Sequence, residues 1–195
     1  MPDFSGYVLA GGRSSRMGTD KAFLEFNGRS LLVRALDLLH RLTTEVHIVG
    51  PATKFAVYGP VVEDIYAGRG PLAGIHAALA TSATDLNLML AVDLPFISEP
   101  LLQFVVERAR TCDALVTVPQ IAGGYQPLCA VYRRDFGRLA QEALESGRNK
   151  IDRLFSAANT RVLEEAELRR FAFHVGMFEN LNTPEDFRRA SAEKS

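Results

Sequence analysis

The chain has 195 residues, 47% hydrophobic and 23% charged, which suits one ordinary hydrophobic core. We therefore expect a single domain over residues 1–190 and a short tail, 191–195, that frays. The formal net charge of -1 argues against the broad basic surface of a nucleic-acid-binding protein. Apolar runs fall far short of the about 20 residues that a membrane span needs, and no signal-peptide pattern opens the chain, so we expect a cytoplasmic protein.

Apolar runs of strand length alternate with segments of helical period along most of the chain. This alternation predicts an α/β fold with a mainly parallel sheet. The expected strands are residues 6–10, 45–49, 60–62, 86–92, 113–118 and 125–132. The expected helices are residues 31–42, 71–81, 98–110, 135–146 and 149–158, and a last helix that Thr183 caps and Pro184 begins.

Residues 86–92 form the most strand-like run, because they are apolar on both alternating faces. A strand buried on both faces is typical of the centre of a parallel sheet, so we predict a central parallel strand there. Asp93 then emerges at its carboxyl end, where α/β sheets bind their ligands.

The cysteines and histidines do not form a recognisable metal-binding pattern. Cys112 and Cys129 have no further cysteine or histidine pair at zinc spacing, and we expect both to be buried thiols. The four histidines also lack partners at ligand spacing. We interpret them as structural or surface residues and expect no histidine-based metal site.

The segment after the first strand, residues 11–28, contains four glycines, two arginines before its first acidic residue, and a lysine. Glycines allow backbone N–H groups to approach an anion, and Arg13, Arg16 and Lys21 supply positive charge for phosphate oxygens. We therefore predict a phosphate-binding loop. Its spacing fits neither a Walker loop nor a dinucleotide fingerprint, and a surface turn with solvated charges is the alternative interpretation.

Carboxylates and amides at strand ends are the next candidates. Asp93 is well placed to hold Mg²⁺, which prefers oxygen ligands shared with substrate phosphates; a local turn cap is the alternative. Asp64 follows a shorter apolar run in a similar setting. Asn180 and Asn182 precede the last predicted helix and could bind metal or substrate, although Asn182 also suits a helix cap.

Several blocks of the sequence, in order and spacing, resemble the molybdenum cofactor guanylyltransferase family over nearly the whole chain. The blocks are Leu-Ala-Gly-Gly-Arg-Ser-Ser-Arg-Met-Gly-Thr-Asp-Lys at 9–21, Leu-Glu-Phe-Asn-Gly at 24–28, Gly-Pro-Leu-Ala-Gly at 70–74, Asp-Leu-Pro-Phe at 93–96 and Asn-Thr-Pro-Glu at 182–185. The first block alone is typical of nucleotidyltransferases in general. The later blocks and the compact length narrow the resemblance to the molybdopterin branch.

The resemblance implies a Rossmann-like, three-layer α/β/α nucleotidyltransferase fold that binds GTP. It places the nucleotide against a set of residues near the ends of the first strands. These nucleotide-binding residues would be Leu9, Ala10, Gly11, Gly12, Arg13, Lys21, Gly50, Asp64 and Asp93. Lys21 would contact phosphate, Asp93 would carry Mg²⁺, and Gly50 would lie near the base or ribose, where family members often have Asn.

Nucleotide preference follows from the same resemblance. Leu-Ala-Gly-Gly accompanies GTP in this family, whereas Leu-Ala-Ala-Gly accompanies CTP in cytidylyl-transferring relatives, so Gly11 favours guanine. The absence of a Cβ at Gly11 leaves room for a purine and lets a backbone N–H approach its edge. The implied partners are GTP and molybdopterin, with other molybdenum cofactor biosynthesis proteins and apo-molybdoenzymes as further candidates.

The implied reaction is attack by the terminal phosphate of molybdopterin on the α-phosphorus of GTP, with pyrophosphate leaving. Asp93 would hold the Mg²⁺, and Lys21 and Arg16 would stabilise the phosphate charge as catalytic groups. The pterin would lie toward Gln126, Pro127, Asn180 and Asn182. A CTP-using transferase acting on molybdopterin or on a sugar or polyol phosphate, and a non-catalytic GTP-binding module, stay open as alternatives.

Overall fold

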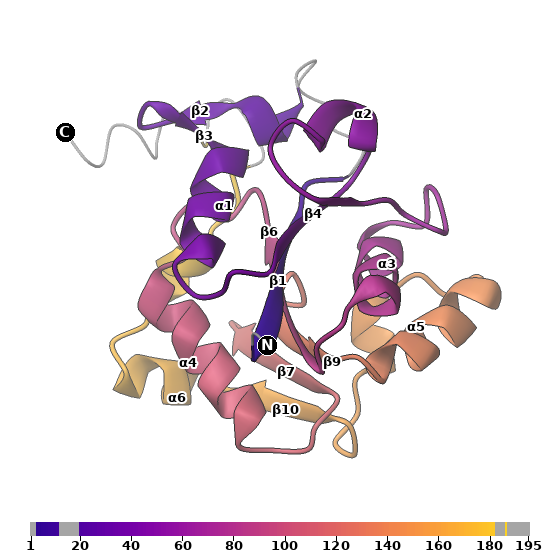
Figure 1. Cartoon of the computed structure of the whole chain (residues 1–195). Helices are drawn as coiled ribbons and strands as arrows, with labels where there is room; N and C mark the ends of the chain where they lie inside the picture. The colour runs from indigo at the N-terminus through magenta and orange to yellow at the C-terminus, as the bar shows by residue number, and fades with distance from the viewer. Residues whose placement is uncertain (1–2, 12–19, 182–185, 187–195) are drawn as a thin grey trace.

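The computed structural model describes residues 3–11, 20–181 and 186 (Figure 1). The predictions for Gly12, Arg13, Arg16, Asn182 and the tail 191–195 therefore lie outside the described residues, as does the start of the last helix. Asp186, which belongs to that expected helix, is helical.

The strands are β1 Phe4–Leu9, β2 Glu25–Phe26, β3 Arg29–Ser30, β4 Val46–Val49, β5 Val61–Val62, β6 Leu86–Ala91, β7 Val116–Ile121, β8 Gly124–Tyr125, β9 Cys129–Arg133 and β10 Thr160–Leu163. The α-helices are α1 Leu31–His40, α2 Ala52–Phe55, α3 Pro71–Thr81, α4 Glu99–Arg110, α5 Phe136–Glu145 and α6 Glu165–Arg170. Short 3₁₀ helices in the described residues are η1 Lys21–Phe23, η2 Ile151–Leu154 and η3 Val175–Phe178. No helix in the described ranges is long and apolar enough to cross a membrane.

The strands of the main sheet follow the order β10-β7-β9-β6-β1-β4-β5, and β8 pairs with β7. β9 runs antiparallel to β6 and β7, whereas the other neighbours on this path are parallel. The prediction of a mainly parallel α/β sheet is thus confirmed. β6 is central as expected, although it is parallel to β1 on one side and antiparallel to β9 on the other.

Helices cover both faces of the sheet, which gives the three layers (Figure 1). Alternation along β1 directs Val8 into the core under α1 and α4, and directs Tyr7 and Leu9 into the core under α3 and α5. Because β1 pairs in parallel with both β4 and β6, the carboxyl ends of these three strands meet at one edge of the sheet, and this edge carries the candidate site.

The structure corrects two predicted elements, one as a whole and one in part. Residues 149–158 do not form a helix: only η2 forms, and the Ser156 N–H donates to Asn159 Oδ1 at 2.9 Å instead of continuing a helix. The strand predicted over residues 125–132 is interrupted by a turn closed by the Cys129 N–H donating to the Gln126 carbonyl, before β9 begins. Pro127 has no N–H to donate to a ladder there.

The remaining differences are smaller. The predicted loop 11–28 contains η1 and the first strand of the β2–β3 hairpin, whose turn residues Asn27 and Gly28 have φ of 52° and 75°. Two positive φ values suit the two-residue Asn-Gly hairpin turn. Cys129 is buried as expected, but Cys112 is only half-buried, which corrects that prediction.

Candidate active site

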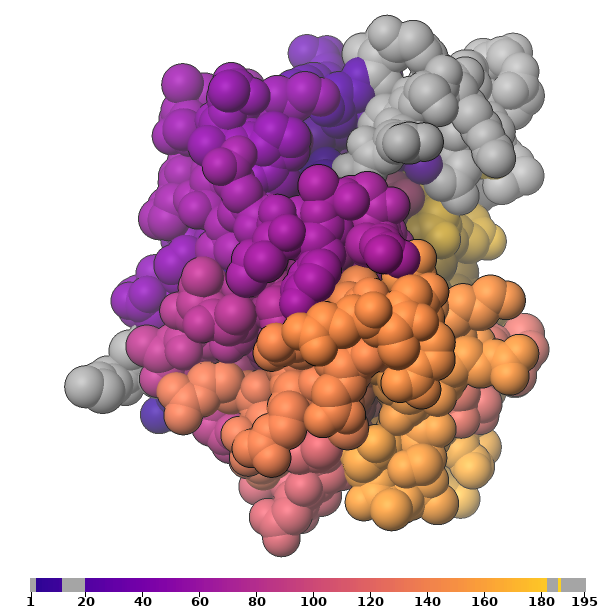
Figure 2. Space-filling model, turned by 90° about the vertical axis from the view of Figure 1, so that its right-hand side faces the viewer, coloured from indigo at the N-terminus to yellow at the C-terminus, as the bar shows by residue number. Residues whose placement is uncertain are grey.

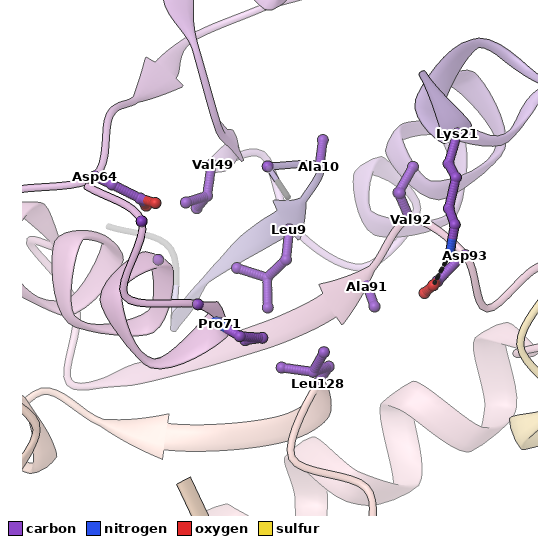
Figure 3. Close-up of a pocket in the computed structure, with 14 residues that line it drawn as sticks. Leu9, Ala10, Lys21, Val49, Asp64, Pro71, Ala91, Val92, Asp93 and Leu128 are labelled. Carbon is purple, nitrogen blue, oxygen red and sulfur yellow. Dashed lines mark hydrogen bonds and ion pairs between the residues drawn. The ribbon is translucent and has the colours of Figure 1, made fainter. Parts of the chain in front are cut away.

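A cavity of about 730 Å³ opens at the carboxyl ends of β1, β4 and β6 (Figure 3). It brings together six of the residues predicted from the sequence to bind nucleotide. These are Leu9, Ala10, Gly11, Lys21, Asp64 and Asp93. The rest of its lining comes from β4, the connection before α3, the first turn of α3, the end of β6 and the residue before β9: Val49, Gly68, Gly70, Pro71, Gly74, Ala91, Val92 and Leu128.

Lys21 and Asp93 form an ion pair at one end of this cavity (Figure 3), with 3.5 Å between Lys21 Nζ and Asp93 Oδ2. Their side chains retain 24% and 23% of their exposure, so both groups remain open to a ligand. Asp93 is held in place through its backbone, because its carbonyl accepts a hydrogen bond from the Leu181 N–H at 3.0 Å.

Asp20 fixes the turn that carries Lys21. Its Oδ1 accepts a hydrogen bond from the Ala22 N–H at 3.2 Å and so caps η1. Its Oδ2 pairs with Lys54 Nζ of α2 at 2.7 Å. Lys21 therefore extends from a short helix whose capping residue, Asp20, is also bound to the neighbouring helix α2.

The segments that follow β1 and β4 lie close together at Gly11 and Gly50. The N–H groups of Ala10 and Gly11 both donate to the Val49 carbonyl, at 3.0 and 2.9 Å. A Cβ on Gly11 would lie 3.4 Å from the Gly50 Cα, and a Cβ on Gly50 would lie 2.7 Å from Phe55 Cε2. The Gly11 N–H expected at the base edge is thus engaged by Val49 in this structure, and Gly50 accommodates Phe55.

Asp64 lies on the other side of the cavity from the Lys21–Asp93 pair, beside the beginning of α3 (Figure 3). A Cβ on Gly74 of α3 would lie 3.1 Å from Val49 Cγ1 and 3.4 Å from Asp64 Oδ1, so the glycine makes room chiefly for Val49. Although Asp64 remains solvent-accessible, partial burial raises the pKa of its carboxyl above the ordinary value of 3.8. A cavity with separate carboxylates at its two sides can distinguish the two ends of an elongated ligand.

The other predicted site residues that the structure describes lie outside the cavity lining. Gly50 directly follows the lining residue Val49. Gln126 and Pro127 come directly before the lining residue Leu128. Asn180 is exposed. Sequence analysis missed Leu128, which has no chemical signature and reaches the cavity only through the turn before β9.

Residues 6–162 match the family model described as the MobA-like NTP transferase domain. The chain belongs to this family. A probable molybdenum cofactor guanylyltransferase of Pelotomaculum thermopropionicum is 36% identical over 188 residues, covering 95% of this chain and 91% of that protein. The molybdenum cofactor guanylyltransferase of Syntrophotalea carbinolica is 31% identical over 185 residues, covering 94% and 88%. The family predicted from the sequence is confirmed.

Solved structures agree with this membership in the MobA-like family. The crystal structure of molybdopterin-guanine dinucleotide biosynthesis protein A from Archaeoglobus fulgidus matches with a TM-score of 0.84 and 25% identity, covering 97% of this chain and 98% of that one. A 4-diphosphocytidyl-2C-methyl-D-erythritol synthase from Anaerococcus prevotii matches with a TM-score of 0.71 at 16% identity, covering 98% and 95%. This second likeness concerns the nucleotidyltransferase fold alone.

Proposed function

We propose that this chain is a molybdenum cofactor guanylyltransferase, which transfers GMP from GTP to the terminal phosphate of molybdopterin. The family and its full-length relatives support this activity. The observation that carries the proposal within the structure is the cavity itself, in which Leu9, Ala10 and Gly11 form one wall and Lys21 meets Asp93. Its volume of about 730 Å³ falls in the range of small-molecule sites.

Charge orients GTP in the cavity. The triphosphate belongs at the Lys21 end, because the ammonium neutralises phosphate oxygens. The Asp64 carboxylate would repel phosphates, so it faces the nucleoside instead, where ribose hydroxyls and guanine N–H groups can donate hydrogen bonds to it. The N-terminus of α3, which begins at Pro71, lies in the cavity wall, and the positive end of the helix dipole there favours an anion or a polar edge.

The reaction needs positioning and charge neutralisation more than a covalent nucleophile. An oxygen of the acceptor phosphate attacks the α-phosphorus of GTP, the new P–O bond forms, and the bond to the β-phosphate oxygen breaks as pyrophosphate leaves. A phosphate monoester has its second pKa near about 6, so the attacking group is already anionic at neutral pH and needs no general base. Lys21 stabilises the negative charge that collects around the α-phosphate and the leaving pyrophosphate.

Asp93 is the residue we propose to hold Mg²⁺. Its carboxylate is the kind of ligand that Mg²⁺ prefers, and it lies at the phosphate end of the cavity. The 3.5 Å separation from Lys21 is longer than a charge-assisted hydrogen bond, so the pair leaves Asp93 available to a cation. When bound there, Mg²⁺ would neutralise negative charge on the phosphates of GTP. Arg16 stays a candidate for assisting Lys21.

The molybdopterin acceptor has candidates on the β8–β9 side of the cavity. Leu128 lines the cavity, and Gln126 and Pro127 lie immediately before it in the turn. Asn180 is next to Leu181, whose N–H donates to the Asp93 carbonyl. We propose that these residues, with Asn182, face the pterin.

Thermal unfolding of the purified chain with GTP, CTP, ATP or UTP, each with and without Mg²⁺, tests the proposal. A ligand at 100 times its Kd stabilises the folded state by about 2.7 kcal/mol, which is readily measured. We expect the largest rise in Tm with GTP and Mg²⁺. In a separate activity assay, we expect pyrophosphate release when molybdopterin is added to the chain with GTP and Mg²⁺. A preference for CTP would assign the chain to a cytidylyl-transferring branch instead, and GTP binding without pyrophosphate release would indicate a binding module.

A further inference from the structure

Residues 63–70 form a long connection between β5 and α3, and they supply Asp64, Gly68 and Gly70 to the cavity wall. Every residue of this described segment is exposed except Tyr66, which is half-buried. Gly68 and Gly70 have φ of 76° and 75°, and a Cβ on either would meet no atom within 4 Å. The backbone of the segment therefore has considerable conformational freedom and little packing to restrict it.

Tyr66 attaches this wall to two helices on the α3–α5 side of the molecule. Its ring packs edge-on against the His76 ring of α3, with 5.2 Å between centroids and an interplanar angle of 69°. Its hydroxyl donates a hydrogen bond to Glu145 Oε1, at the end of α5, over 3.2 Å. Figure 2, which faces this side, shows the purple surface of the residues before α3 meeting the orange surface of α5.

The partners of Tyr66 are themselves held. His76 is 6% exposed, and burial lowers its pKa, which favours the neutral ring against which an aromatic edge can pack. Glu145 Oε1 also accepts a hydrogen bond from Gln141 Nε2 at 2.8 Å, one helical turn earlier. The contacts of Tyr66 thus lead to fixed positions in α3 and α5.

We propose that Tyr66 is a positioning residue for the nucleotide site: by its ring and its hydroxyl it fixes the segment that presents Asp64 to the ligand. This inference rests on the proposed binding of GTP in the cavity. Tyr66 does not line the cavity, so it acts through the segment and not through contact with the nucleotide. An ordered wall reduces the entropy that GTP binding would otherwise have to remove.

Hydrogen exchange of residues 63–70 in the nucleotide-free chain and the Kd for GTP test this role together. Tyr66→Phe keeps the ring contact and removes the hydrogen bond, Glu145→Ala removes the acceptor, and Tyr66→Ala removes both attachments. We expect hydrogen exchange of residues 63–70 to be faster in all three variants. The Kd for GTP should rise about threefold in Tyr66→Phe and in Glu145→Ala, and about tenfold in Tyr66→Ala. Because Tyr66→Phe and Glu145→Ala disrupt one hydrogen bond, their effects on Kd should not add in the double variant. The kcat at saturating GTP should stay within about twofold of the wild type, because the transition-state contacts are intact.

Tyr58→Phe is the matched control, because the Tyr58 hydroxyl forms no hydrogen bond in the described part of the chain and its ring contact with Phe23 would remain. Unchanged exchange in Tyr66→Ala, or faster exchange with an unchanged Kd, would overturn the proposal. If the wild-type chain does not bind GTP, the proposed function fails, while the exchange data still decide whether Tyr66 orders the wall.

Discussion

Lys21 and Asp93 are 72 positions apart in the sequence and face each other at 3.5 Å in the cavity. Lys21 belongs to η1, in the connection that follows β1, and Asp93 follows β6. Because β1 and β6 are parallel neighbours, their carboxyl ends lie side by side, and the residues that follow them meet there. The sheet topology thus brings the two segments together, and the Asp20 cap of η1 places Lys21 within the first of them.

Lys21→Ala should lower kcat by about 100-fold, because it removes a preorganised positive charge from the phosphate end of the cavity. The free energy of unfolding should change by less than about 1 kcal/mol, since a partly exposed ion pair contributes little to stability. Pyrophosphate release with saturating GTP and molybdopterin measures the first effect, and urea unfolding measures the second.

Arg161→Ala is the control for Lys21→Ala, because it also removes an exposed ion-paired cation, on β10. It should leave pyrophosphate release unchanged. Equal kcat values for wild type and Lys21→Ala would remove Lys21 from the proposed mechanism.

Asp93→Ala should abolish the part of GTP affinity that depends on Mg²⁺. The wild-type Kd for GTP is expected to fall when Mg²⁺ is added, whereas the variant should give the same weaker Kd with and without the cation. Calorimetric titration of GTP at matched ionic strength measures both values. A variant that retains the full Mg²⁺ effect would show that the cation is held elsewhere.

Asp64 should make stability depend on pH in a predictable direction. Partial burial raises the folded-state pKa above 3.8, so the folded state binds this proton more tightly than the unfolded state does. Stability from this group is therefore greatest at pH below 3.8 and is lost as the pH rises through the folded-state pKa. Asp64→Asn, which stays neutral, should unfold at a higher Tm than the wild type at neutral pH.

The Tm difference between Asp64→Asn and the wild type should shrink as the pH is lowered toward 3.8. A difference that does not change with pH would contradict the assignment of the shift to Asp64. At neutral pH, Asp64→Asn should bind GTP more weakly than the wild type, because the amide is a weaker acceptor for ribose or guanine donors than the carboxylate. A gain in stability with a loss of affinity is the signature expected of a binding residue.

The sequence predicts the fold where periodicity and caps agree. Residues 71–81 were predicted and observed as a helix, since glycine and proline precede an apolar run of small residues. β10 was missed because its residues alternate weakly, and its pairing with β7 is established only in the folded chain. Residues 149–158 mislead because Ile151, Leu154 and Phe155 have helical spacing, while the Asn159 side chain favours a turn.

The residues of the candidate site likewise fall into those that the sequence predicts and those that it does not. Lys21 and Asp93 are recognisable because glycines, cations and an acid follow apolar strands, and strand ends meet in a parallel sheet. The wall contributed by Leu128 and the close approach of Gly74 to Val49 depend on how distant segments approach one another. No local pattern of residue types records such an approach.

Gly50→Ala should destabilise the fold by about 1–3 kcal/mol, because the new Cβ would lie 2.7 Å from Phe55 Cε2 and 3.2 Å from the Gly11 nitrogen. Phe55 is fully buried and cannot simply turn into solvent. Phe55→Leu removes the ring atoms of this contact, so the double variant should lose about 1 kcal/mol less than the sum of the single variants. Urea unfolding of all four chains measures this coupling. Strictly additive losses would show that the Phe55 ring is not the reason that position 50 requires glycine.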